Sequence, residues 1–351
     1  MFDFLPSNVH FLFKNQQIFG VILSQNMLIR YFKSNSASSL VILPLIALAI
    51  WAFGFASPPP LPLQHAMPLY EFVAGPIADI HWLTTIFSAA LVIAEAFLLN
   101  YIVNENEVLT KQTWLPALLY ILFMSNNPDM LLLHPMLFSN LFVLFALNKM
   151  LSAYRRDNSF SQCFDAGMLI SIATLFYYPA IVFFPLMAAA LIIMRPSFNW
   201  REWLIAALGA MVPYAFVVTF YFWNGTLEYL LYDKMFYQFL REKPHMEFPK
   251  SFYFMLSVGW GVVLLSLFTL LQGVGIGSQR SKKSVILLMW FFFFSALSVL
   301  IAPEISTKYF SALAIPTAVF CANYFAHVRR GWWAETLFLL LVVALFVNLL
   351  R

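Results

Sequence analysis

Two carboxylates between the first two apolar runs, Glu71 and Asp79, have the chemistry of a general base. A carboxylate can take the proton from an attacking hydroxyl group. The surrounding segment reads "SPPPLPLQHAMPLYEFVAGPIADIHW" (57–82), and its second half is predicted to form a short helix lying at a membrane surface. Glu71 and Asp79 are therefore candidate catalytic residues. The alternative is that the segment is an ordinary amphipathic loop.

A second group of polar side chains follows in "MSNNPDMLLLHPMLFSN" (124–140). Asp129 and His134 fall at the end of an apolar run, and Asn140 lies about two helical turns deeper. Ionisable groups in membrane segments are costly, so these three residues are candidate substrate contacts. Each of the first two residues has a structural alternative: a hydrogen bond from His134 to a neighbouring helix, and capping by Asp129 of the helix that it begins.

A third group lies in "NGTLEYLLYDKMFYQFLREKPHMEF" (224–248), where aromatic and basic residues alternate. Arg241 and Lys243 are candidate contacts for a phosphate group, and aromatic faces suit sugar rings. Tyr178, next to a proline in the middle of a long apolar run, is a further candidate substrate contact. The alternative for 224–248 is an interfacial amphipathic helix whose cations extend toward the headgroups.

The composition excludes a soluble protein. Of the 351 residues, 62% are hydrophobic and only 10% are charged, whereas soluble domains carry about 25% charged residues. No phosphate-binding glycine loop, dinucleotide-binding turn or metal-ligand spacing of Cys and His is present. Cys163 and Cys321 are predicted to be small apolar core residues. Nothing in the sequence indicates a nucleic-acid partner.

Apolar runs predict an all-α, polytopic integral membrane protein with about eleven transmembrane helices. The run 166–194 contains no charged residue and is too long for one upright helix. The predicted spans are 40–56, 82–103, 114–124, 130–151, two within 166–194, 203–223, 252–271, 285–301, 309–327 and 333–350.

Positive charges orient these spans, because Lys and Arg concentrate on the cytoplasmic side of a membrane. Arg30 and Lys33 precede the first span, which predicts a cytoplasmic N-terminus. Basic residues also flank both ends of 166–194, so this run must cross twice, with an outer turn at 177–179. Proline disfavours helical geometry in the residue before it, which suits a break there. The loops 57–80 and 224–250 then lie outside.

The chain is predicted to consist of an N-terminal cytoplasmic or interfacial segment, 1–37, and a single transmembrane domain, 38–351. Residues 1–26 lack the basic start and cleavage site of a signal peptide. Translation from Met27 or a helix lying on the membrane surface would each account for them.

Three stretches carry a resemblance to the C-type (GT-C) superfamily of membrane glycosyltransferases. A span ending in "LFALNKMLSAYRRDNS" precedes the hairpin "FDAGMLISIATLFYYPAIVFFPLMAAALIIM", and "EWLIAALGAMVPYAFVVTFYFW" follows a further basic loop. The chain after Met27 also resembles an uncharacterised bacterial family of polytopic membrane proteins, on "LLNYIVNENEVLTKQTWLPALLYILFMS", "HPMLFSNLFVLFALNKML" and "NWREWLIA".

The glycosyltransferase resemblance implies an active site at the outer face of the bacterial cytoplasmic membrane, with a polyprenyl-phosphate sugar as donor. It also implies an acid in the first outer loop that acts as base or helps to hold a divalent metal. Glu71 or Asp79 would fill that position, although neither directly follows the first span as the superfamily's acid does. Near the fourth span, where a second acid is common, this chain has His134 and Asn140, with Asp129 upstream.

We therefore expect sugar transfer from a lipid-phosphate donor, with Glu71 or Asp79 as base and with Arg241 and Lys243 at the donor phosphate. The alternative is a non-catalytic membrane subunit that binds a protein partner or a membrane lipid. A transporter is disfavoured because the spans carry almost no charge.

Overall fold

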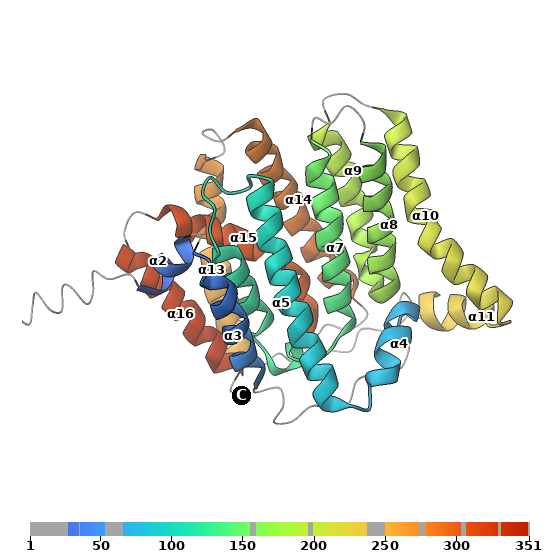
Figure 1. Ribbon diagram of the computed structural model, residues 1–351, viewed down its shortest axis with the longest axis horizontal. Coiled ribbons are helices and arrows are strands. Elements are labelled where there is room, and N and C mark those ends of the chain that lie inside the picture. The colour runs from blue at the N-terminus through green and yellow to red at the C-terminus, as the bar shows by residue number, and fades with distance from the viewer. Residues whose placement is uncertain are drawn as a thin grey trace, which may run out of the picture.

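In the computed structural model the described residues are 27–34, 36–52, 66–154, 159–195, 199–236, 250–273, 278–302, 307–328 and 331–349. Every regular element in these ranges is a helix (Figure 1). The main helical elements of the first half of the chain are α2 (Met27–Lys33), α3 (Ser39–Trp51), α4 (Pro68–Ala74), α5 (His81–Glu105), α6 (Leu115–Met124), α7 (Pro135–Ser152), α8 (Phe160–Phe176), η4 (Tyr178–Val182) and α9 (Phe183–Met194).

The second half of the chain continues the helical bundle. Its elements are α10 (Trp200–Trp223), α11 (Leu227–Tyr229), the π-helix η5 (Leu230–Phe236), α13 (Lys250–Gly273), α14 (Gln279–Ile301), η6 (Thr307–Phe310), α15 (Ser311–His327) and α16 (Gly331–Leu349).

Within the described ranges, seven helices are long and apolar enough to cross a membrane, so the protein is a multi-pass membrane protein. They are α5, α7, α10, α13, α14, α15 with η6, and α16. Four shorter apolar helices, α3, α6, α8 and η4 with α9, occupy the positions of the other predicted spans. The total of about eleven spans and the cytoplasmic N-terminus stay predictions.

The predicted break in the run 166–194 is confirmed. Helix α8 ends at Phe176, and Tyr177 is extended (φ −142°, ψ 105°). The proline-bearing turn η4 follows and leads into α9, which packs beside α8. Because Pro179 lacks an amide donor and restricts Tyr178, a continuous helix would lose a hydrogen bond at this point.

The helices surround α15, which is the most buried of the seven candidate spans. It packs against α6, α13 and α14, while α5 and α7 complete the same core. Both cysteines are buried free thiols, as predicted. Helix α10 is the least buried span and stands at one edge of the bundle, with α11 at its foot (Figure 1).

Helix α10 is held to the bundle mainly through α8, at a crossing made by two glycines. A Cβ atom on Gly167 would overlap the backbone carbonyl of Ala206, and one on Gly209 would overlap that of Phe164. Small residues at such a crossing let two backbones approach closely, which is how helices associate within a membrane. Ser171 adds a hydrogen bond from its hydroxyl to the carbonyl of Ala210, at 2.6 Å.

Candidate functional site

A groove of about 690 Å³ lies between α4 and the end of α10 with α11. Its walls are mostly apolar and aromatic, and Glu71 is the one carboxylate among the described lining residues. The lining residues are Pro68, Leu69, Glu71, Phe72, Phe216, Val217, Phe220, Tyr221, Thr226 and Tyr229. This combination of an apolar wall and a charged end suits an amphiphilic ligand.

A buried lysine pairs with the carboxylate of the groove. The ammonium group of Lys234 contacts the Glu71 carboxylate and donates a hydrogen bond to the carbonyl of Ala66 at 2.7 Å. It also lies 5.3 Å from the centroid of the Tyr229 ring, within cation–π range. Lys234 belongs to the π-helix η5, a rare geometry that often occurs at functional sites.

Helix α4 is anchored through the residue next to Glu71. Tyr70 is fully buried, donates a hydrogen bond to the carbonyl of Leu133 at 3.1 Å and packs edge-on against Phe138. Burial raises the pKa of the Tyr70 hydroxyl, so this residue stays a neutral donor. The predicted short helix in the first loop is thus present. Through Tyr70 this helix is held at the start of α7, which fixes the position of Glu71 in the groove.

The second candidate base, Asp79, does not line the groove. It is exposed and lies beyond α4, just before α5 begins. The two predicted catalytic carboxylates are therefore separated in the structure, and only Glu71 belongs to the groove.

The predicted contacts near α7 form a separate polar region. The exposed Asp129 accepts a hydrogen bond from Thr307 at 3.3 Å. The side chain of Asn127, not that of Asp129, caps the short helix there. Asn140 is buried and donates to the carbonyl of Ser311 at 3.3 Å, which ties α7 to α15.

His134 stands at the N-cap position of α7 and is buried. Neither of its ring nitrogens has a hydrogen-bond partner among the described residues. Burial, reinforced by the positive charge of Lys308, lowers the pKa of the imidazole to about 3. One alternative for His134 was a hydrogen bond to a neighbouring helix. The described residues contain no such bond.

The remaining predicted contacts do not join the groove either. Tyr178 is buried at the start of η4 and does not line it. Arg241 and Lys243 lie outside the described residues.

The sequence patterns singled out neither Lys234, the partner of Glu71, nor an ionisable group inside the bundle, Glu95. Glu95, in the middle of α5, is completely buried, and Tyr120 donates a hydrogen bond to it at 2.8 Å. This hydrogen bond joins α5 to α6. A lone acid within the predicted span 82–103 was the signal that marked Glu95.

A metal site is not evident in the part of the chain that the structure describes. No group of three or more His, Cys, Asp or Glu side chains gathers there. The single carboxylate of the groove does not by itself make a site for a divalent ion. The groove therefore offers an apolar wall and one carboxylate, which is paired with the buried Lys234.

These features define a multi-pass helical membrane protein with an amphipathic groove at one end of its spans. Residues 68–350 match the Family of unknown function (DUF6427), and the chain belongs to that family. The predicted membership of an uncharacterised family is thereby confirmed, and the glycosyltransferase resemblance stays a prediction. No curated protein and no solved structure matches the chain.

Proposed function

We propose that the protein transfers a sugar from a polyprenyl-phosphate donor at the outer face of the bacterial cytoplasmic membrane. The observation that supports this function is the groove of about 690 Å³ in which one carboxylate, paired with a buried lysine, stands beside an apolar wall. The isoprenoid chain lies along the aromatic and aliphatic side chains of α10, where it is removed from water.

The charged end of the groove supplies the base that glycosyl transfer needs. Glu71 takes the proton of the acceptor hydroxyl as its oxygen attacks the anomeric carbon of the sugar. The bond between that carbon and the phosphate oxygen breaks, and the polyprenyl phosphate leaves with the electron pair. Arg241 and Lys243 are the predicted contacts that compensate the negative charge on the leaving phosphate.

The proposal is tested by mass spectrometry of lipid-linked and surface glycans. A deletion strain is complemented with wild type, with Glu71→Gln or with Asp79→Asn at matched protein levels. We expect a glycan to vanish on deletion, to return with wild type and Asp79→Asn, and to stay absent with Glu71→Gln. Unchanged glycans in the deletion strain would overturn the proposal.

A second function is favoured by the ion pair itself. Because Lys234 already occupies the Glu71 carboxylate, the groove is also suited to a non-catalytic subunit that binds a membrane lipid or a protein partner. In that case Glu71→Gln restores every glycan, and a photoactivatable polyprenyl phosphate labels the groove without turnover.

A further inference from the structure

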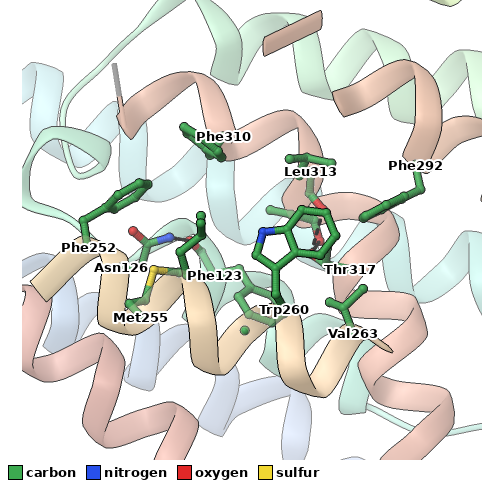
Figure 2. A pocket seen from close by; sticks show the side chains of 13 residues that line it. Phe123, Asn126, Phe252, Met255, Trp260, Val263, Phe292, Phe310, Leu313 and Thr317 are labelled. Carbon is green, nitrogen blue, oxygen red and sulfur yellow. Dashed lines mark hydrogen bonds between the residues drawn. The ribbon is translucent and has the colours of Figure 1, made fainter. Parts of the chain in front are cut away.

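A second cavity, of about 80 Å³, lies between α13 and α15 (Figure 2) and shares no lining residue with the groove. Aromatic side chains from α6, α13, α14 and η6 surround it, and most of its lining is apolar. The aromatic lining residues are Phe123, Phe252, Trp260, Phe292 and Phe310.

One polar atom at this cavity lacks a partner. The side chain of Asn126, only 5% exposed, donates from Nδ2 to the carbonyl of Phe123 at 2.6 Å. Its Oδ1 atom accepts no hydrogen bond from the described residues. Thr317 also lines the cavity, but its hydroxyl donates to the carbonyl of Leu313 at 2.6 Å. A buried acceptor without a donor is costly, so Asn126 Oδ1 marks where a ligand's O–H or N–H belongs.

The length of the cavity's lining along α13 matches one leaflet of a membrane. Its lining on α13 runs from Phe252 to Val263, a rise of about 16 Å in an α-helix. That length is about half of a 30 Å hydrocarbon core. Asn126 follows the last turn of α6 and lies at the Phe252 end of the cavity (Figure 2). Helix α13 is a candidate membrane span with little of its surface buried, so lipid has access to this face.

We propose that this cavity binds one chain of a single membrane lipid that carries an O–H or N–H where the chain meets the headgroup. That group donates to Asn126 Oδ1, and the chain packs along the aromatic side chains between α13 and α15. N-acylated sphingoid lipids have such donors, whereas diacyl phosphatidylcholine has only ester acceptors at that depth. This site is independent of the proposed transferase function.

Two glycines on α13 provide a variant and a matched control. Gly259 lines the cavity, and a Cβ atom built there meets nothing within 4 Å. Gly259→Leu therefore fills the binding space without a backbone clash. Gly261 has the same freedom but is not part of the lining. Gly261→Leu makes the same chemical change on the same helix and leaves the cavity open.

The experiment uses the full chain in phosphatidylcholine nanodiscs that contain a trace of one photoactivatable lipid. The probes are N-acyl sphingosine and phosphatidylcholine, each with a diazirine at the same mid-chain position, and mass spectrometry locates the labelled peptides. In wild type we expect the sphingosine probe to label 252–263 about three to ten times more than the phosphatidylcholine probe, the preference that one extra hydrogen bond supplies. Gly259→Leu should abolish this labelling, and Gly261→Leu should retain it.

Equal labelling by the two probes, or labelling confined to other helices, would overturn the proposal. So would full labelling of a Gly259→Leu protein that elutes as a single folded species. The wild-type comparison needs no variant, so it decides the matter even if Gly259→Leu does not fold.

Discussion

Lys234 and Glu71 form an ion pair whose two members are buried to very different degrees. The lysine side chain is 1% exposed, whereas 44% of the glutamate side chain is exposed. A buried charge is strongly destabilising once its partner is lost, but a carboxylate that reaches water keeps its solvation. Replacing Glu71 should therefore lower the stability of the protein by more than replacing Lys234.

We expect Glu71→Gln to lower the free energy of unfolding by about 1–3 kcal/mol, because it leaves the Lys234 ammonium buried with a neutral partner. Lys234→Met should cost about 1 kcal/mol or less, since it replaces the cation by an apolar side chain of similar length. Thermal unfolding in detergent, followed by tryptophan fluorescence, measures both. The double variant should recover most of the stability that Glu71→Gln loses. If Lys234→Met lowers the stability as much as Glu71→Gln or more, the expected difference between the two residues is contradicted.

The same double variant separates stability from chemistry. If Glu71 acts as base, Glu71→Gln with Lys234→Met is stable but still fails to restore the glycan. If Glu71 only neutralises Lys234, the double variant restores it.

The close crossing of α8 and α10 predicts intolerance of a single methyl group. Gly167→Ala or Gly209→Ala should destabilise the protein by about 1–3 kcal/mol, because the new Cβ overlaps a backbone carbonyl that no side-chain rotation can move. Gly259→Ala, where a Cβ meets nothing, is the matched control. Unfolding temperatures of the three variants in one detergent provide the measurement. Wild-type stability of Gly167→Ala and Gly209→Ala would show that this crossing relaxes.

Because α10 forms one wall of the groove, the same two variants should also weaken binding there. Labelling of the groove by a photoactivatable polyprenyl phosphate should fall with Gly167→Ala and Gly209→Ala. Labelling with Gly259→Ala should match wild type.

The sequence predicted those features of the fold that depend on neighbouring residues. Apolar runs located the helices, because a segment in lipid needs apolar side chains along its length and hydrogen bonds within its own helix. Pro179 marked the break before α9, because proline disrupts a helix through its immediate neighbours. The Glu71–Lys234 pair joins residues 163 positions apart. Only tertiary packing decides such a contact, so Glu71 was recognised without its partner. Asp79, with the same chemistry eight positions later, could not be distinguished from it.

The buried pair of Glu95 and Tyr120 predicts a marked difference between isosteric and apolar replacement. Glu95→Gln should cost about 1 kcal/mol or less, since an amide oxygen still accepts from the Tyr120 hydroxyl. Glu95→Leu leaves that hydroxyl without this acceptor and should cost about 1–3 kcal/mol. The yield of monodisperse protein and its unfolding temperature measure the difference. Tyr120→Phe combined with Glu95→Leu should be less destabilising than the sum of the two, and strict additivity would argue against the contact.

His134 predicts a loss of stability in acid. Its pKa is about 3 in the folded protein and 6.5 ordinarily. Between these values the unfolded chain binds a proton that the folded chain excludes, so stability rises with pH in this window and falls as the pH drops through it. The slope from this one group approaches at most about 1.4 kcal/mol per pH unit. His134→Leu should remove that contribution and cost little at neutral pH, because neither ring nitrogen has a partner among the described residues.

Unfolding measured from pH 7.5 to pH 4 tests this prediction, with the exposed His81 changed to Leu as the control. If His134→Leu and wild type lose stability equally across the window, the imidazole is protonated without cost and its burial does not govern the acid response.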